Sequence, residues 1–357
     1  MKCGILTFIH TLNYGATLQA YALSQCLQMS AYDVEIVNYT CPAVKMREEP
    51  RFPSFVDIKD IKHAIGMLFK FPEHSLRMRR FRNFESKYMS FGNCCHTTND
   101  ILKYYNAVIV GSDQVWCPQI TGNDLTYVLG DKLFPNQKII SYAASFGDKS
   151  FPDTLKKHFE TALKRFDALS VREERGVEIL CSMGIKDAVV SVDPTLLLES
   201  GQWKRVEKPV KTHGKYVFAY VVSERNQTLA FAKRAAEQLD ADLLYIDAYS
   251  GRPVSGARNM GGCGPDEFLW LINNAELVVT SSFHGLCFSV LFNKQFRYSL
   301  SSKKNNSRLY NLTMQLGLER FDVTNTDLND RISYVKPNNE LAHLREESMD
   351  FLRNALA

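Results

Sequence analysis

The strongest candidate for chemistry in this chain is a histidine that follows a buried strand. The stretch VVTSSFHGL at 278–286 reads as an apolar strand that ends in two hydroxyl residues, and an apolar helix begins near His284. Free backbone N–H groups at a helix start favour anions, and Ser281 and Ser282 can cap the helix or contact such an anion. Because its titration range lies near neutral pH, His284 suits proton transfer. The alternative is a capping cluster in which the histidine has a purely structural hydrogen bond.

Two charged residues follow other short apolar runs. Arg172, in SVREERG at 170–176, comes directly after a strand, where a guanidinium fits a carboxylate or phosphate. A surface salt bridge to a neighbouring glutamate is the alternative. Asp113, in VGSDQVW at 110–116, lies in a turn after a strand and is a candidate general base or hydroxyl binder. An Asx-type helix cap is the equally simple interpretation.

The turn after the first strand is a weaker candidate. Its sequence, NYGA at 13–16, has a single glycine and does not form the GxGxxG pattern, so a dinucleotide is poorly supported. His10 lies close to this turn and is a weak candidate for the same region. Lys303 and Lys304, with Arg308 downstream, form a positive cluster that is either solvated surface or a phosphate-neutralising loop. Asp193, in VDPT, is expected to fix a turn.

These candidates need a framework, and the order of apolar segments predicts an α/β fold. Strand-like runs at 3–9, 33–39, 106–111 and 138–144 alternate with helical patterns such as 17–29 and 152–167. After a polar, linker-like stretch that follows residue 198, a second series has strands at 215–223, 242–248 and 276–282. We therefore predict two Rossmann-like domains, 1–198 and 199–357, that face a cleft and bind ligands at the carboxyl ends of their strands.

One segment departs from this alternation. Residues 45–87 carry eleven basic and six acidic side chains around an apolar helical stretch at 61–71. A helical excursion at about 45–90 that packs on the first domain is one interpretation. A surface for anionic lipid or diphosphate groups, with peripheral membrane contact, is the other. No recognition motif accompanies the charge, so we expect no nucleic-acid partner.

The composition of the 357-residue chain is that of an ordinary globular protein. It has 43 Lys and Arg against 39 Asp and Glu, and 45% of its residues are hydrophobic, which argues against disorder and low-complexity assemblies. No apolar run approaches the length of a membrane span, and the N-terminus reads as a strand and not as a signal peptide. The nine cysteines show no paired metal-ligand spacing, so we predict a cytoplasmic protein with reduced thiols and no metal.

Taken together, the motifs resemble those of the polysaccharide pyruvyl transferase family. The resemblance runs in order through GILTFIHTLNYGATLQAYAL, VIVGSDQVW, ISYAASFG, SVREERGVEIL, VDPTLLL and SSFHGLCFSVLF, and it covers most of residues 3–318. Members of the family are similar to GT-B glycosyltransferases in fold. The resemblance implies transfer of pyruvate from phosphoenolpyruvate onto a sugar, as a cyclic ketal and with release of phosphate. It implies no cofactor.

The resemblance also implies roles for individual residues. His284 would be the general acid and Arg172 an anchor for phosphoenolpyruvate. Asp113, from its place in the turn, stays a candidate acceptor of the hydroxyl proton. The implied donor-binding set is Arg172, Ser281, Ser282, Phe283, His284 and Lys304, with Lys303 as an alternative to Lys304. The implied acceptor-binding set is Asn13, Tyr14, Gly15, Asp113 and Gln114.

The implied acceptor is a hexosyl glycan of a surface-polysaccharide precursor. It is either free or linked to polyprenyl diphosphate, and the linked form would be met at the inner face of the membrane. The final helix is expected to pack back on the N-terminal domain. Two other functions are compatible with the same pair of Rossmann-like domains. One is a GT-B glycosyltransferase that uses a nucleotide sugar, and the other is a module that binds a phosphorylated glycan without turnover.

Overall fold

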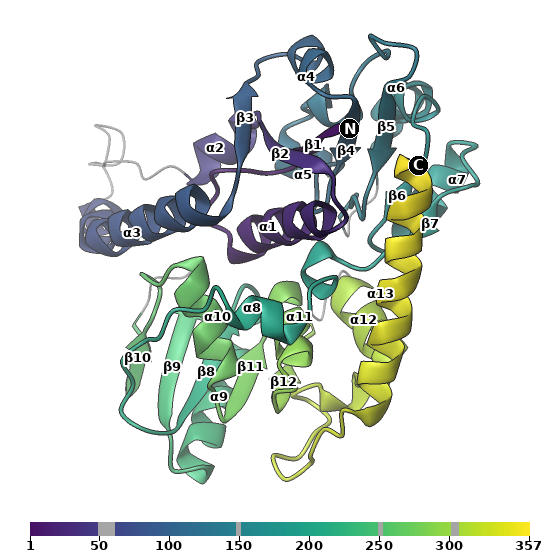
Figure 1. Cartoon of the computed structure of the whole chain (residues 1–357). Coiled ribbons are helices and arrows are strands. Elements are labelled where there is room, and N and C mark those ends of the chain that lie inside the picture. The colour runs from purple at the N-terminus through teal and green to yellow at the C-terminus, as the bar shows by residue number, and fades with distance from the viewer. Residues whose placement is uncertain (49–60, 148–150, 249–252, 301–306) are drawn as a thin grey trace.

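Two parallel β-sheets, one in each half of the chain, form the framework of the molecule (Figure 1). The computed structural model describes residues 1–48, 61–147, 151–248, 253–300 and 307–357. The central strands are continuous apolar runs because both of their faces are buried under helices and loops. This architecture confirms the prediction of an α/β fold with two Rossmann-like sheets.

The first sheet has the strand order β3-β2-β1-β4-β5, which places β1 at its centre. A small sheet of β6 and β7 lies beside it, joined through isolated bridges from Ile140 to Ala168 and from Ala144 to Val171. The carboxyl ends of β4, β5 and β6 therefore open on one edge. The strands are β1 (Lys2–Leu6), β2 (Asp33–Asn38), β3 (Phe91–Cys94), β4 (Ala107–Val110), β5 (Lys138–Ser141), β6 (Ser170–Val171) and β7 (Val189–Val190).

Helices connect these parallel strands, as parallel pairing requires. The helix predicted over 17–29 begins earlier, at Tyr14, because the side-chain Oδ1 of Asn13 accepts hydrogen bonds from the backbone N–H groups of Gly15 and Ala16. The helices of this half are α1 (Tyr14–Met29), α2 (Pro42–Glu48), α3 (Ile61–Tyr88), α4 (Thr98–Tyr104), α5 (Pro118–Thr121), α6 (Asp153–Leu163) and α7 (Glu174–Ser182), with a 3₁₀ turn at Leu125–Val128.

The second sheet repeats the pattern with the order β10-β9-β8-β11-β12. Its strands are β8 (Tyr216–Val221), β9 (Asp242–Asp247), β10 (Ala257–Asn259), β11 (Leu277–Thr280) and β12 (Phe296–Tyr298). Its helices are α8 (Ser200–Lys204), α9 (Arg225–Gln238), α10 (Pro265–Asn273), α11 (Phe283–Leu291), α12 (Ser307–Leu316) and α13 (Val335–Leu356), with 3₁₀ turns at Pro194–Leu196 and Glu319–Phe321.

The stretch expected to be a linker is partly ordered. It contains α8, and Trp203 of that helix is fully buried, with its Nε1–H donating to the carbonyl of Thr195 at 3.1 Å. One apolar core runs through this region from the first sheet to the second, because its buried members include Ile5 and Trp203 as well as Phe288. The two halves are therefore joined by continuous packing as well as by the chain.

Aromatic rings close the contact between the halves. Tyr14, at the start of α1, stacks on Phe268 of α10 with ring centroids 4.4 Å apart, and Tyr220 and Phe81 pack against it from β8 and α3. The Tyr14 hydroxyl donates to the carbonyl of Cys263 at 2.8 Å. Stacked and edge-on aromatic pairs add to the free energy of burial, so this cluster fixes how α1 meets the second half.

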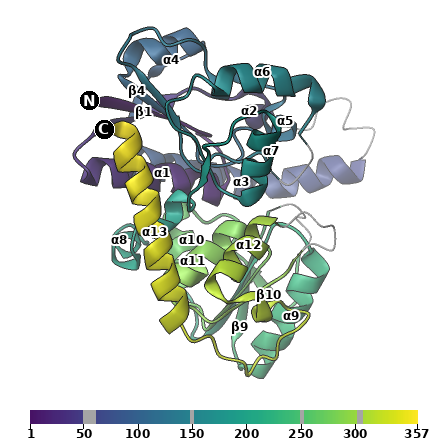
Figure 2. The same cartoon turned by 90° about the vertical axis from the view of Figure 1, so that its right-hand side faces the viewer.

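The last helix spans both halves of the molecule (Figure 2). On α13, Ser348 Oγ accepts a hydrogen bond from the backbone N–H of Val192 at 3.0 Å, and Met349 contacts Cys26 of α1. Arg345 Nε donates to the carbonyl of Leu196 at 2.8 Å. The helix thus begins in the second half and packs on the first.

The basic excursion is largely α3, and its described side chains divide into two groups. Arg77 Nη2 donates to the carbonyl of Leu12 at 2.6 Å, and Arg80 Nη1 forms an ion pair with Glu267 of α10 at 2.7 Å. Arg79, Arg82 and Lys87 are exposed. The described part of the helix is therefore packed between the halves and also presents a basic surface. The residues 49–60, and the side chains of 61–71, lie outside the described part of the structure.

All nine cysteine thiols are free in the structure. Within the described residues, none of the helices combines the length and the apolar character that crossing a membrane would need.

Replacing Phe268, on which Tyr14 stacks, tests how strongly the fold depends on the aromatic cluster between the two halves. Phe268 is fully buried, so we expect Phe268→Ala to lower the free energy of unfolding by about 3–5 kcal/mol. Urea denaturation followed by fluorescence measures it. Phe134→Ala is the matched control, because Phe134 is half exposed and should cost less than about 0.5 kcal/mol. Equal losses in both variants would contradict the role given to the ring.

Candidate functional site

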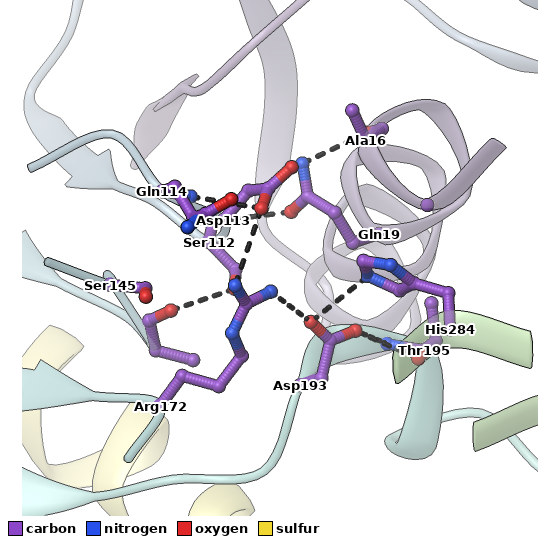
Figure 3. Close-up of polar contacts among 12 residues, drawn as sticks. Ala16, Gln19, Ser112, Asp113, Gln114, Ser145, Arg172, Asp193, Thr195 and His284 are labelled. Carbon is purple, nitrogen blue, oxygen red and sulfur yellow. Dashed lines mark hydrogen bonds and ion pairs between the residues drawn. The ribbon is translucent and has the colours of Figure 1, made fainter. Parts of the chain in front are cut away.

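Charged residues from four chain segments meet where the strands of the first half end and α11 of the second half begins (Figure 3). Arg172 follows β6, Asp113 follows β4, Asp193 follows β7, and His284 lies in the first turn of α11. The structure thus brings together the three predicted catalytic residues, Arg172, Asp113 and His284, and adds Asp193. Carboxyl ends of parallel strands are where ligands bind in such folds.

Arg172 is the centre of this charged cluster. Its side chain is 1% exposed, Nη1 donates to Asp193 Oδ2 at 2.8 Å, and Nη2 donates to Asp113 Oδ1 at 3.3 Å. Glu173 lies on the third side, with Oε2 3.8 Å from Nε. Burial alone would lower the pKa of Arg172, but the three carboxylates raise it above its ordinary value. Arg172 is therefore a fixed buried cation and not a surface salt bridge.

Asp193 joins this arginine to the histidine. Its Oδ2 lies 3.4 Å from His284 Nε2, an ion-pair distance that forms a charged contact when the ring is protonated. Its Oδ1 accepts hydrogen bonds from the backbone N–H and the hydroxyl of Thr195, at 3.0 and 2.7 Å. Burial opposes its charge, but His284 and Arg172 lower the pKa of Asp193 well below its usual value.

The sequence interpretation of Asp193 was only partly right. Asp193 does fix the turn at Pro194–Leu196, as expected, yet it also orients His284, which was not predicted. The signal was available in the VDPT motif, because a carboxylate at the end of a short strand lies at the ligand-binding edge.

His284 is held on both sides of its ring. Nε2 is buried against Asp193, while Nδ1 faces the first turn of α1. A Cβ atom on Gly15 would lie 1.9 Å from Nδ1, so only glycine leaves room for the ring there. The side chain is 10% exposed. Asp193 thus meets the ring at Nε2, and Gly15 packs against the ring near Nδ1.

The start of α11 supplies backbone donors beside this ring. Ser282 caps the helix, with Oγ accepting from the N–H of Gly285 at 3.3 Å, and helix N-termini favour anions. The ring of Phe283 packs beneath two guanidinium groups, 5.1 Å from Arg172 and 5.9 Å from Arg308. These positions agree with an anion site near Phe283.

Ser281 lies elsewhere than predicted. Its hydroxyl donates to the carbonyl of Ser223 at 2.8 Å and accepts from the N–H groups of Val222 and Ser223, both at 3.0 Å. All of these contacts tie β11 to the loop after β8. Ser281 is thus a strand-linking residue in the structure, and Ser282 alone has the capping role.

The loop after β4 is fixed by a residue that sequence reasoning missed. Gln19 of α1 accepts from the backbone N–H of Ser112 at 3.2 Å and donates to Thr7 Oγ1 at 2.9 Å. Asp113 has a left-handed φ of 72°, and Gln114 donates its backbone N–H to Asp113 Oδ1 at 2.9 Å. The Asx-type contact predicted for Asp113 is present together with its ion pair to Arg172.

The residues of the predicted acceptor-binding set have different environments in the structure. Asn13 is exposed and caps α1, Gly15 contacts His284, and Gln114 is half-buried next to Asp113. Tyr14 is the correction, because its ring is fully buried between the halves and its hydroxyl donates to Cys263. A buried, hydrogen-bonded hydroxyl in the interface cannot meet a substrate, so Tyr14 has a packing role.

A cavity of about 200 Å³ adjoins the cluster. Arg172, Asp193, Phe283 and Arg308 contribute to its wall, together with α12 and α13. This volume suits a small molecule and not a drug-sized one.

Lys303 and Lys304 lie outside the described residues. Across the described ranges, no group of three or more His, Cys, Asp or Glu side chains is placed to hold a metal ion.

Comparison with protein families gives one match over most of the chain. Residues 13–302 match the family model described as polysaccharide pyruvyl transferase. No curated protein matches the sequence.

Solved structures show the fold of the whole chain. The UDP-GlcNAc 2-epimerase of Methanocaldococcus jannaschii superposes with a TM-score of 0.52 at 13% identity, over 98% of this chain and 93% of that one. A Listeria monocytogenes protein assigned as a UDP-N-acetylglucosamine 2-epimerase gives a TM-score of 0.50 at 11% identity, over 99% and 91%. At these identities the likeness concerns the fold alone, which is of the GT-B type.

A methyl group at residue 15 tests the packing of the histidine. Gly15→Ala should displace the His284 ring, because the added Cβ falls 1.9 Å from Nδ1. We expect the NMR signals of the imidazole to shift and stability to fall, although alanine favours helix over glycine by about 1 kcal/mol. Gly201→Ala in α8 is the matched control, since its Cβ meets nothing within 4 Å. An unchanged imidazole spectrum in Gly15→Ala would contradict this packing.

Neutralising the central carboxylate tests the ion pairs. Asp193→Asn leaves Arg172 with one partner fewer, and breaking a buried pair costs about 3–5 kcal/mol. The lowered pKa of Asp193 means that its stabilising contribution is present above its unfolded-state value of about 3.9 and is lost as pH falls below it. The difference from the wild type should therefore be large at neutral pH and shrink below about pH 4.

Urea unfolding of the wild type and of Asp193→Asn, at neutral pH and below about pH 4, measures this difference in the free energy of unfolding. The control is Asp187→Asn, because Asp187 is exposed. A stability difference that is the same at neutral and acid pH would rule out the charge of Asp193 as its cause.

Proposed function

The chain belongs to the polysaccharide pyruvyl transferase family, and from this premise we propose that it transfers pyruvate from phosphoenolpyruvate to a saccharide. The product is a cyclic ketal that bridges two hydroxyl groups of a hexosyl unit, and phosphate is released. The observation that carries the proposal is the position of His284, whose Nε2 faces the buried Asp193 at 3.4 Å while Nδ1 faces the start of α1.

A held imidazolium suits the first chemical step. The enol carbon of phosphoenolpyruvate becomes electrophilic only when its methylene group is protonated. His284 would deliver this proton, while the Asp193 carboxylate provides the counter-charge to the imidazolium. General acid catalysis of this kind contributes about 10²–10⁴-fold in rate.

The complete step balances with groups that this chain and the substrates supply. The methylene gains one proton from His284 and becomes a methyl group, and one acceptor oxygen bonds to the cationic carbon. The carbon–oxygen bond to phosphate then breaks with its electron pair, and the second hydroxyl closes the ketal. Of the two hydroxyl protons, one replaces the proton used at the methylene and the other leaves on hydrogen phosphate.

The donor is an anion at both ends and needs positive partners. The start of α11 offers backbone N–H groups beside His284, and Arg308 lies above the Phe283 ring. Arg172 lines the adjoining cavity, but its Nη1 and Nη2 groups already donate to Asp193 and Asp113. We therefore assign Arg172 chiefly to holding these carboxylates, and Lys304 or Lys303 remains a proposed donor contact.

The proposal extends to the acceptor and its carrier. We infer a hexosyl glycan linked to polyprenyl diphosphate, met at the inner face of the membrane during surface-polysaccharide synthesis. The support is the exposed basic set on α3, Arg79, Arg82 and Lys87, since such clusters attract phosphate groups of lipids.

One assay tests these statements together. The protein is incubated with phosphoenolpyruvate and a panel of hexosides, each free and linked to polyprenyl diphosphate, while phosphate release and acceptor mass are followed. A mass gain for one pyruvyl ketal supports transfer, and faster use of the linked form supports the lipid carrier. Equal rates with free and lipid-linked acceptors would contradict the proposed lipid carrier. Consumption of a UDP- or GDP-sugar instead of phosphoenolpyruvate would replace the proposed function by glycosyl transfer.

Removal of the imidazole tests the acid. We expect His284→Ala to lower kcat by about 10²–10⁴-fold, because the proton donor is lost, and to lower the urea midpoint, because Asp193 loses a buried partner; the rates are therefore compared without urea, after circular dichroism has shown that the variant is folded. Initial rates of phosphate release measure this. His158→Ala is the control, because His158 is an exposed residue of α6. Full activity of His284→Ala would show that another group protonates the donor.

A further inference from the structure

A second cavity lies on the other side of the loop that follows β1. It measures about 490 Å³ and is lined by Ile9, His10 and Leu12 of that loop, by α2, and by α3 and Phe91. This volume falls in the range of small-molecule sites. The loop leads directly to Asn13 and Gly15, and Gly15 contacts the His284 ring. One short segment, from Ile9 to Gly15, therefore borders the cavity and contacts the proposed acid.

A histidine in the wall of this cavity is held by a buried carboxylate. His10 Nδ1 lies 2.9 Å from Glu85 Oε2, and the backbone N–H of His10 donates to Glu85 Oε1 at 3.1 Å. Glu85 is 4% exposed, whereas the His10 side chain is 42% exposed. The ring also packs against Phe91, with centroids 4.9 Å apart. One carboxylate therefore fixes both the ring and the backbone of His10.

This arrangement sets the chemistry of the other ring nitrogen. A carboxylate that accepts from Nδ1–H fixes the tautomer in which Nε2 is the proton acceptor. Glu85 raises the pKa of His10, an effect that burial and Arg82 oppose and Asn38 of β2 supports. The charged groups that face the cavity from α2 are Lys45 and Glu48. A histidine with these neighbours can accept a proton from a hydroxyl in the cavity.

The cavity also has the composition that a sugar requires. Apolar side chains of Ile9, Val44 and Met78 offer surfaces for the C–H face of a hexose ring, while Thr40 and Glu48 offer hydrogen-bond partners for its hydroxyls. Glu48 is close enough to Asp113 for the two charges to interact. The loop that borders this cavity at Ile9–Leu12 also leads to the helix start that contacts His284.

We propose that this cavity holds the acceptor saccharide and that His10, oriented by Glu85, is the general base that takes the proton of the attacking hydroxyl. This inference rests on the proposed pyruvyl transfer. As the acceptor oxygen bonds to the cationic carbon of the donor, its proton passes to Nε2 of His10, and the resulting imidazolium is stabilised by Glu85. Solvent later removes this proton and restores the one lost from His284.

Asp113 is less suited to this role. Its Oδ1 accepts from both Arg172 and the backbone of Gln114, so this oxygen is already engaged. Asp113 thereby positions Arg172, and His10 replaces it as the base.

The test compares acceptor kinetics with donor binding. In His10→Gln, kcat/KM for the acceptor hexoside should fall by about 10²–10⁴-fold, while the Kd for phosphoenolpyruvate stays within about twofold of the wild type. The wild-type pH profile should lose activity on the acid side, and His10→Gln should lack this limb. Added imidazole should restore activity to His10→Gly. His343→Gln is the matched control, because His343 is an exposed residue of α13 that also faces a glutamate.

Binding is followed separately, so that failure of this inference and failure of the proposed function can be told apart. The NMR signal of the His10 imidazole is recorded as methyl hexosides are added, and again with an alkyl detergent. A shift with a hexoside but no pyruvyl transfer would support a saccharide site and overturn the proposed function and the base. Pyruvyl transfer that is unchanged in His10→Gln, no shift with any hexoside, or a shift with the detergent alone would overturn this inference.

Discussion

The central constraint in this molecule is the charge of Asp193. A carboxylate without exposure to water is stable as an anion only when cations and hydrogen-bond donors surround it. Arg172 supplies one cation from the end of β6, Thr195 supplies two donors, and His284 supplies the remaining contact from α11. Because Arg172 and His284 come from different sheets, satisfying one buried charge also fixes how the second half meets the first.

The start of α1 completes this arrangement from the opposite side. Asn13 caps the helix, and Gly15 lets the His284 ring approach it to a distance that any side chain would block. Tyr14, which lies between these two residues, stacks on Phe268, and its hydroxyl donates a hydrogen bond to the carbonyl of Cys263. The same helical turn therefore carries both the packing that joins the halves and the space that the histidine needs. This explains why three adjacent residues, predicted as one acceptor-binding group, have three separate roles.

Local sequence patterns predicted the sheets and the positions of Arg172, Asp113 and His284, because strand ends and helix starts are set by nearby residues. They did not reveal partners that are distant along the chain. Gln19 holds Ser112 across 93 residues, and Glu85 holds His10 across 75. Ser281 was assigned to the site from its position beside Ser282, yet its hydroxyl is used by the loop after β8. Such pairings follow from how the elements pack, which no spacing rule contains.

The two held histidines differ in a way that suits opposite tasks. His284 is nearly enclosed, because its carboxylate partner meets Nε2 and its ring packs on Gly15. His10 is half exposed in a larger cavity, and its carboxylate partner meets Nδ1, so the opposite nitrogen can meet a hydroxyl and return its proton to solvent. A reaction that adds a proton to carbon and removes one from oxygen needs both environments. His10 and Gly15, which contacts the His284 ring, lie five residues apart in the chain, so one short segment borders both environments.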